Sequence, residues 1–370
     1  MPVPLLDLRA QHATIRDAVL NAMLPVVEDQ SFILGSPVAQ IEQEVAHLSH
    51  TRFAVGCASG TDALLLALRA LDVGPGDEVV TTPFTFFATA GTIHLVGAKT
   101  VFVDIDPKTF NIRPDLVAGA ISANTKAIMP VDLFGQMAAI DEIQRLVPRI
   151  PIIEDAAQSI GARRSIDGEW RMAGELAAIG TFSFFPSKNL GGYGDGGMMV
   201  TQDDALYKRL LRLRTHGSVR TYVHEEVGYN SRLDALQAAV LHAKLPFLAG
   251  WSAKRRENAL YYNSGLGDVT DVVTPYVDPE NESIFNQYTL RVPRRDDLKK
   301  HLTAKQIGHS VYYPLPLHLQ PCFAYLGYVA GACPESERAA EEVLSLPIYP
   351  ELTRAELDEV IAAVRSFFGQ

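Results

Sequence analysis

The chain has 370 residues, and its 33 Lys and Arg residues against 43 Asp and Glu residues leave a formal net charge of −10. This balance argues against a nucleic-acid-binding protein, because neutralising phosphates requires a basic surface. With 47% hydrophobic residues the chain can bury a sizeable core, and its length predicts two domains.

Cysteine and histidine usage narrows the class further. Cys57, Cys322 and Cys333 are too few and too scattered for a disulfide framework or a four-ligand zinc site. The ten histidines have no metal-ligand spacing, so no metal is expected. Asp7 and Arg9 interrupt the apolar stretch that a signal peptide would need, and no later segment has about 20 consecutive apolar residues. We therefore expect a soluble, cytoplasmic protein.

Short apolar runs alternate with helical patterns through the first two-thirds of the chain. Seven runs predict strands: Phe53–Cys57, Glu78–Thr82, Thr100–Asp104, Ala127–Val131, Pro151–Glu154, Ile179–Phe184 and Gly197–Thr201. The stretches between them predict helices, among them Asp62–Leu71, Phe87–Val96, Ile140–Leu146 and Ala205–Arg214. Most of the runs are apolar throughout, as in strands that helices cover on both faces. The pattern predicts an α/β three-layer sandwich around a mostly parallel, seven-stranded mixed sheet.

The pattern changes after Ser231. The rest of the chain predicts two helices, two strands and a final helix: Asp234–Leu245, Trp251–Tyr262, Tyr288–Val292, His309–Tyr313 and Arg354–Phe368. This part is too short for another doubly wound sheet. We therefore expect a large domain over residues 1–245 and a smaller α+β domain over residues 246–370.

Ligands in open α/β sheets bind beyond the carboxyl ends of the strands. The first candidate stretch there is Cys57–Leu64, in which a strand ends, small residues turn the chain and a helix begins. Free backbone N–H groups and the positive end of the helix dipole would suit a phosphate. The same residues also occur in ordinary helix N-caps, so this stretch alone leaves both interpretations open.

Three further stretches carry side chains of interest. Asp155 ends an apolar run, where a carboxylate can hold a cationic ring nitrogen or merely cap the next helix. Lys188 stands between an aromatic strand and a glycine-rich run, where the amine can be shielded from water and become nucleophilic, or can be an ordinary surface lysine. The aromatic cluster in Pro83–Thr89 could stack on a flat ring or belong to the core.

Together the four stretches offer a phosphate cradle, an aromatic platform, an acid and a lysine. Pyridoxal 5′-phosphate requires that combination. The lysine binds its aldehyde, the acid keeps its pyridine nitrogen protonated so that the ring acts as an electron sink, and the helix end binds its phosphate. The joint pattern therefore predicts a pyridoxal-phosphate enzyme.

The sequence also resembles the DegT/DnrJ-type sugar-nucleotide aminotransferases, a branch of the aspartate-aminotransferase fold (fold type I), over nearly its whole length. The matching stretches are Phe32–Val38, Ser59–Leu64, Gly74–Val79, Glu154–Gln158, Phe185–Gly191, Asn230–Ala239 and Tyr313–Gln320. The resemblance implies a pyridoxal-phosphate-dependent transaminase that passes through pyridoxamine 5′-phosphate during turnover.

The resemblance implies roles for individual residues. Lys188 would be the catalytic Schiff-base lysine, and the other cofactor-binding residues would be Gly60, Thr61, Phe86, Asp155, Gln158, Ser183 and Asn230. Asp155 would pair with the pyridine nitrogen and Phe86 would stack on the ring. The family's asparagine at the position of Asn230 reaches the phosphate from the neighbouring subunit, which implies a homodimer with shared sites. The expected substrate contacts are Phe185, Arg232, Tyr313 and His318.

The resemblance also bears on the reaction. The dehydratase branch of the family has histidine at the position of Lys188, so the lysine favours transamination. We expect L-glutamate as donor and carbon 3 of a dTDP-3-keto-6-deoxyhexose as acceptor, in aminosugar biosynthesis for lipopolysaccharide or antibiotic glycans. Many relatives have His-Tyr-Pro where this chain has Tyr312-Tyr313-Pro314, which leaves the hexose shape and the position of amination open.

Two alternatives remain at this stage. A UDP-2-acetamido-3-keto-glucuronate is another possible acceptor, and Arg232 could supply the cation that its carboxylate needs. A pyridoxal-phosphate-binding regulatory protein without turnover is an alternative of a different class. The joint presence of Lys188, Asp155, Gln158 and Ser183 argues against it.

Overall fold

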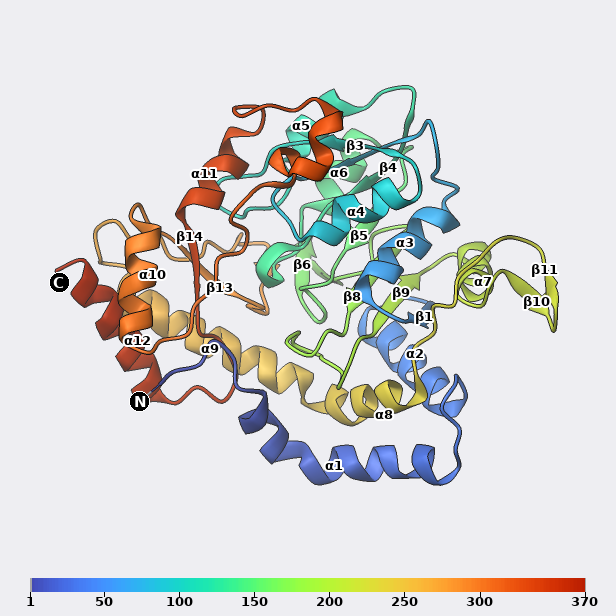
Figure 1. The fold of residues 1–370 in the computed structure, drawn as a ribbon, viewed down its shortest axis with the longest axis horizontal. Helices are drawn as coiled ribbons and strands as arrows, with labels where there is room; N and C mark the ends of the chain where they lie inside the picture. Colours follow the sequence, from blue (N-terminus) through green and yellow to red (C-terminus); the bar gives the residue numbers. More distant parts are fainter. Residues whose placement is uncertain (1, 370) are drawn as a thin grey trace.

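The computed structural model describes residues 2–369, and two sheets form its centre (Figure 1). The first has the strand order β1-β9-β8-β5, built from β1 (Phe53–Cys57), β5 (Ile153–Asp155), β8 (Ile179–Ser183) and β9 (Gly197–Thr201). The second has the order β3-β2-β4, built from β2 (Glu78–Thr81), β3 (Lys99–Phe102) and β4 (Thr125–Met129). Strand β9 is antiparallel to both its neighbours, and the other pairs are parallel. The expected α/β class with a mixed sheet is confirmed.

The seven expected strands are present, but their hydrogen bonds do not form one continuous ladder. Between β4 and β5 the described residues make isolated bridges, at Ile128 with Ile152 and at Val131 with Asp155. Pro130 and Pro151 lie at this junction and accept hydrogen bonds through their carbonyl groups. Because proline has no N–H group to donate, the ladder is interrupted there. The structure therefore has a four-stranded and a three-stranded sheet side by side.

Helices cover both faces of the four-stranded sheet. On one face lie α3 (Gly60–Ala70) and α7 (Asp204–Leu213), and on the other lie α2 (Ser36–Leu48) and α8 (Ala235–Lys244). Successive strand residues point to opposite faces, so Val55 packs with α3 whereas Ala54 packs with α2. Around the three-stranded sheet lie α4 (Phe87–Leu95), α5 (Pro114–Ala120) and α6 (Ile140–Leu146).

The last third of the chain has a core of its own, at the left of Figure 1. Its elements are α9 (Leu248–Leu266), β13 (Tyr288–Arg291), α10 (Arg295–Ala304), α11 (Pro334–Glu342), β14 (Val343–Leu346) and α12 (Arg354–Phe367). Val3, from the start of the chain, packs into the same core and bridges to Ile307. The domain boundary at residue 245 stays a prediction.

The expected strand His309–Tyr313 is wrong. Ser310 makes one bridge with Ser345 of β14, and the chain then leaves the sheet edge toward Pro314. This departure places Tyr313 beside Gln158 of the large sheet, with 3.2 Å between the Gln158 Nε2 and the tyrosine hydroxyl. A sequence run rich in β-forming residues has thus become a connection that reaches the sheet ends.

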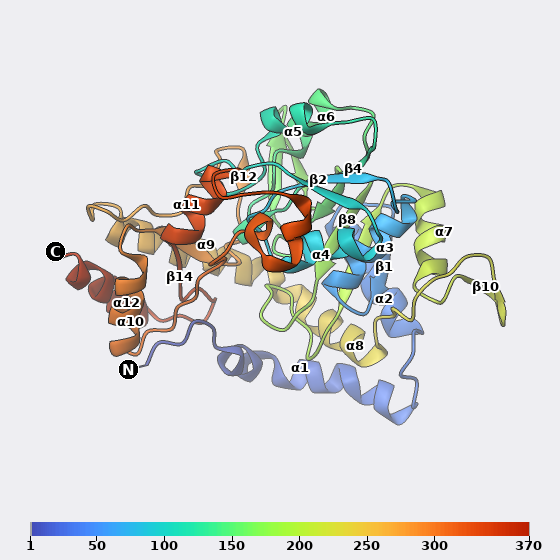
Figure 2. The ribbon, with the colours of Figure 1, turned by 45° about the horizontal axis from the view of Figure 1, so that its top comes forward.

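Two peripheral features frame the body. Helix α1 (Leu8–Glu28) runs alongside α8 in both ribbon views (Figures 1 and 2). The hairpin of β10 (Ser218–Arg220) and β11 (Val223–His224) projects from the opposite end to the C-terminal helices (Figure 1). The short strands β6 (Arg163–Ile166), β7 (Glu169–Met172) and β12 (Asn281–Glu282) form a small antiparallel sheet. Across residues 2–369 no helix is long and apolar enough to cross a membrane.

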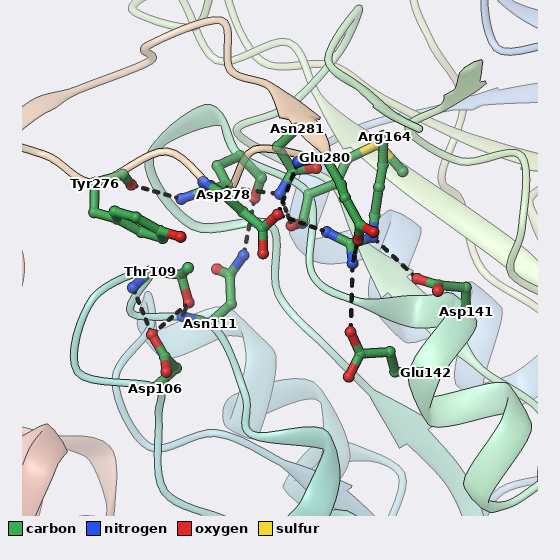
Figure 3. A network of polar contacts seen from close by, with 12 residues as sticks. Asp106, Thr109, Asn111, Asp141, Glu142, Arg164, Tyr276, Asp278, Glu280 and Asn281 are labelled. Atoms are coloured by element: carbon green, nitrogen blue, oxygen red, sulfur yellow. Dashed lines mark hydrogen bonds and ion pairs between the residues drawn. The ribbon is translucent and has the colours of Figure 1, made fainter. Parts of the chain in front are cut away.

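A buried arginine ties this small sheet to α6 (Figure 3). Arg164 is 1% exposed, and its guanidinium pairs with Asp141 at 3.0 Å, with Glu142 at 3.5 Å and with Glu280. A buried charge of this kind requires partners, because its removal from water is otherwise strongly unfavourable. The network therefore holds the segment before β12 against the helix that follows β4.

We predict that Arg164→Ala destabilises the protein by about 3 kcal/mol, because it leaves carboxylates facing a cavity without their cation. Arg145 is a matched control, since it pairs with the same Asp141 at 3.0 Å but is 72% exposed. Arg145→Ala should change the unfolding free energy by less than about 1 kcal/mol. Urea unfolding of both variants measures the difference, and equal losses would contradict the structural role assigned to Arg164.

Candidate active site

Lys188 lies in the turn that follows β8, and the residue after it fixes this turn. Asn189 is buried, and its side-chain amide donates to the Ile284 carbonyl at 3.0 Å. The side-chain Oδ1 of Asn189 accepts from the side-chain amide of Asn286 at 2.8 Å. Two hydrogen bonds to a segment nearly 100 residues further along the chain thus hold the backbone that carries Lys188.

The amine of Lys188 is placed where it can lose its proton near neutral pH. Burial lowers the pKa of Lys188 to about 8, although the nearby charge of Asp155 raises it. The described residues offer its Nζ no hydrogen bond or ion pair. Lys188 is half-buried, and an amine with a lowered pKa is a nucleophile and a general base.

Asp155 is the acidic residue that interacts electrostatically with Lys188. Its side chain is buried at the end of β5 and accepts from the Thr89 hydroxyl at 2.8 Å and from the Ala157 N–H at 3.3 Å. Burial raises the pKa of Asp155, whereas these two hydrogen bonds and Lys188 oppose the rise. Thr89, in α4, was missed by the sequence reasoning; its spacing of four residues from Thr85, whose hydroxyl lies 3.0 Å away, was the available signal.

The N-terminus of α3 lies directly against Ser183. The Ser59 hydroxyl caps the helix by accepting the Asp62 N–H at 3.1 Å. As the first two helical residues, Gly60 and Thr61 have N–H groups that no carbonyl of the helix can accept. A Cβ atom at residue 60 would lie 2.6 Å from the Cβ of Ser183, so the close approach of these two elements requires glycine.

The carboxylate of Asp62 would disfavour an anion at this helix end, but it has a partner of its own. The Ser231 hydroxyl donates to Asp62 Oδ2 at 2.6 Å and accepts from the Ala58 N–H at 3.3 Å. Ser231 therefore fixes the chain between Asn230 and Arg232 beside the start of α3. Sequence reasoning did not single out Ser231, because a lone serine gives no signal before its partners are known.

Aromatic side chains line the same region. Phe86, at the N-cap of α4, is 58% exposed, and Phe185 is 52% exposed. The ring of Phe86 lies 6.4 Å from that of Tyr313. Tyr313 contacts the buried Gln158, whose Oε1 accepts the Phe134 N–H at 2.7 Å. The structure thus brings Tyr313, Gln158 and Phe86 together, and it leaves large apolar surfaces of Phe86 and Phe185 open to a ligand.

Asn230 and Arg232 border a cavity of about 400 Å³ beside the start of α3. Its lining is Ala58, Gly194, Asp195, Asn230, Arg232, Asp234 and Gln237. Asn230 is exposed. In the part of the chain that the structure describes, Arg232 makes no ion pair or hydrogen bond, so its guanidinium is available to an anion.

His318 is not brought to this group. Its side chain is 1% exposed, and its Nε2 lies 2.9 Å from Glu337 Oε1. Its ring packs against Phe102 and Tyr328, and its Nδ1 has no partner. The expectation that His318 contacts the substrate therefore finds no support in the geometry, because a buried imidazole between these groups has no surface to offer.

The sequence of this chain is similar to a known family and to several known proteins over nearly its whole length. The sequence model of the DegT/DnrJ/EryC1/StrS aminotransferase family matches residues 13–365. The pleiotropic regulatory protein of Geobacillus stearothermophilus is 47% identical, over 100% of this chain and 99% of its own. The UDP-N-acetyl-3-dehydro-alpha-D-glucosamine 3-aminotransferase of Acidithiobacillus ferrooxidans is 45% identical, over 98% and 97%. The UDP-2-acetamido-2-deoxy-3-oxo-D-glucuronate aminotransferase of Pseudomonas aeruginosa is 42% identical, over 98% and 99%.

Solved structures match at the level of the whole fold. S. venezuelae DesV in complex with a ketimine intermediate has a TM-score of 0.96 and 40% identity, covering 100% of this chain and 99% of its own. The Bacillus subtilis protein NtdA with bound cofactor PMP has a TM-score of 0.89 and 30% identity, covering 99% and 83%.

The lowered pKa of Lys188 predicts how fast the cofactor-free protein captures the aldehyde of pyridoxal phosphate. Only the deprotonated amine attacks, so the capture rate should rise about tenfold per pH unit below pH 8 and level off above about 8. Stopped-flow absorbance measures the rate, and borohydride reduction with peptide mass spectrometry locates the bond. Lys188→Arg should abolish capture at this site. A rate that kept rising to pH 10, as for an ordinary lysine, would contradict the assigned environment.

Proposed function

The chain belongs to the DegT/DnrJ/EryC1/StrS aminotransferase family, and from this premise we propose that it transfers an amino group from L-glutamate to carbon 3 of a nucleotide-linked 3-keto hexose. The single observation that carries the proposal is the half-buried amine of Lys188, whose pKa is lowered, within electrostatic reach of the buried Asp155. The relatives from A. ferrooxidans and P. aeruginosa, by their names, aminate a UDP-linked 3-oxo sugar.

Pyridoxal phosphate is the cofactor of this enzyme, and the residues present fit it. The free N–H groups of Gly60 and Thr61 point out of a helix end that only glycine allows to approach Ser183, which is a phosphate-binding arrangement. The exposed ring of Phe86 offers a stacking surface, and Asp155 offers a carboxylate for the ring nitrogen. When bound, the cofactor supplies an electron sink for the pair of electrons released at carbon.

The chain's own residues would divide the work as follows. Asp155, held by Thr89, keeps a proton on the pyridine nitrogen by a charge-assisted hydrogen bond. The Nζ of Lys188 removes the proton from the α-carbon of glutamate and later delivers one to carbon 3 of the sugar. Gln158, fixed by the Phe134 N–H and by Tyr313, orients groups beside the ring.

The acceptor is the finer part of the proposal. Arg232, unpaired beside the 400 Å³ cavity, suits the pyrophosphate of a sugar nucleotide. It would equally suit the carboxylate of a UDP-2-acetamido-3-keto-glucuronate, and the P. aeruginosa relative's name supports this second acceptor. A dTDP-3-keto-6-deoxyhexose is the acceptor that the carboxyl-terminal stretch of the sequence favours. Both acceptors have the 3-keto group, which is why the proposal centres on carbon 3.

We predict that adding L-glutamate to the pyridoxal-phosphate-loaded protein shifts the cofactor's absorbance to that of pyridoxamine phosphate, and that the correct ketosugar reverses the shift. The candidates are a dTDP-3-keto-6-deoxyhexose, a UDP-2-acetamido-3-keto-glucose and a UDP-2-acetamido-3-keto-glucuronate. Asp155→Asn should slow the first step by several orders of magnitude, because the ring nitrogen loses its anionic partner. A spectrum indifferent to amino donors would instead favour a regulatory protein without turnover.

The exposed position of Asn230 leads to a second prediction. We propose a homodimer in which Asn230 of one subunit reaches the phosphate in the site of the other. Lys188→Ala and Asn230→Ala homodimers should then each be nearly inactive, whereas their co-expression should restore about one quarter of the activity, because half of the dimers carry one intact site. As a control, Lys188→Ala should not be rescued by the Lys188→Ala, Asn230→Ala double variant. No recovery in the first mixture would rule out shared sites.

A further inference from the structure

Two carboxyl groups lie directly behind the candidate active site, and the proposed mechanism uses neither. Asp132 follows β4 and Glu154 lies in β5, and both side chains are 0% exposed. The two side chains are neighbours, and each shifts the pKa of the other. Two ionised carboxylates so close together in a water-free interior would repel strongly. The contact therefore requires a proton.

The surrounding donors show which carboxyl carries it. Asp132 accepts from the Ala138 N–H at 2.8 Å and from the Ser159 hydroxyl at 2.7 Å, as an anion would. Glu154 Oε2 accepts from the Gly174 N–H at 2.9 Å, whereas its Oε1 has no donor among residues 2–369. A proton on Glu154 Oε1, donated to Asp132, leaves neither carboxyl with an unpaired oxygen.

Asp132 and its neighbours in the chain join the two loops that carry the candidate site. The Asp132 N–H donates to the Asp155 carbonyl at 3.0 Å, and the Asp155 N–H donates to the Pro130 carbonyl at 2.9 Å. Ser159, next to Gln158, donates to Asp132, and the Phe134 N–H donates to Gln158. The position of Asp132 therefore determines where Asp155 and Gln158 lie.

We propose that Glu154 and Asp132 share one proton and that this pair positions Asp155 and Gln158 for the cofactor. The proposal rests on the proposed function in that these two residues serve pyridoxal phosphate, but it does not depend on the acceptor. Glu154 precedes Asp155 in the strand, so its ionisation would add a second charge beside the carboxylate meant for the ring nitrogen. The shared proton keeps Asp155 as the anion that faces Lys188.

The charged neighbours of the pair are few. Glu154 faces Glu175, which is paired with Arg171 at 2.9 Å and with His50 at 3.3 Å, and Asp132 faces Asp155. Burial raises the pKa of Asp132 to about 6 and that of Glu154 well above its usual range.

The sign of the pH dependence follows from these raised pKa values. The folded protein keeps a proton that the unfolded chain releases above about pH 4. The pair therefore makes the folded state less stable as pH rises from about 4 through the raised pKa values of Asp132 and Glu154.

Glu154→Gln tests the proposal, because glutamine keeps the shape and donates an N–H to Asp132 without a titrating proton. The pyridoxal-phosphate-loaded variant should lose less thermal stability between pH 5 and pH 8 than the natural protein loses. Its infrared spectrum at neutral pH should lack a protonated-carboxyl band that the natural protein shows. Glu169→Gln, at an exposed glutamate, is the matched control and should change neither. A pH profile and a band unchanged by Glu154→Gln would overturn the proposal.

Cofactor affinity, measured by absorbance titration, tests the positioning role. Glu154→Ala removes the hydrogen bond that Glu154 would donate to Asp132, and it should weaken binding of pyridoxal phosphate about tenfold. Glu154→Gln should change the affinity for pyridoxal phosphate by less than about twofold. Equal loss in both variants would overturn the role of the donated hydrogen bond. If Glu154→Ala does not fold, the infrared and pH arms with Glu154→Gln still decide the question. None of these measurements uses a ketosugar, so failure of the acceptor proposal would leave them unaffected.

Discussion

The placement of a half-buried amine, Lys188, near a buried carboxylate, Asp155, is the constraint on which the rest of the site depends. Loss of water lowers the pKa of Lys188 and raises that of Asp155, whereas the attraction between the two opposes both shifts. Neither group can lie there alone without strong destabilisation of its charged form. The hydrogen bond from Thr89 fixes the side chain of Asp155, and the hydrogen bond from Asn286 to Asn189 fixes the turn that carries Lys188.

The sheets could be predicted from the sequence because their signal is local. The strands Phe53–Cys57 and Gly197–Thr201 have the expected bounds, since helices bury both faces and leave the runs apolar throughout. The interruption between β4 and β5 could not be foreseen, because Pro130 and Pro151 each pair with a segment that is distant in sequence. The segment His309–Tyr313 was wrongly predicted as a strand because its residues favour one locally. Within the described chain it makes one bridge, from Ser310 to Ser345 of β14.

The site residues likewise divide into those with a local sequence signal and those that depend on distant partners. Lys188 and Asp155 lie where strands end, and strand ends can be located from a single sequence. Ser231 and the pair of Asp132 with Glu154 act through partners from other elements, so no local pattern identifies them. Thr89 had only its spacing from Thr85 as a local signal. The burial of His318 against Glu337 depends on packing that a motif does not encode, and its contact with the substrate stays a prediction.

The bonds from Asn189 to Ile284 and Asn286 have a consequence for the order in which the protein matures. A chain emerging from the ribosome exposes Lys188 long before the segment that fixes its turn has been made. Val3, which precedes Lys188 in the chain, likewise forms its bridge only after Ile307 has been made. A nascent chain stopped before Asn286 can hold the central strands but not the finished turn around Lys188, so the reactive lysine acquires its final setting late in synthesis.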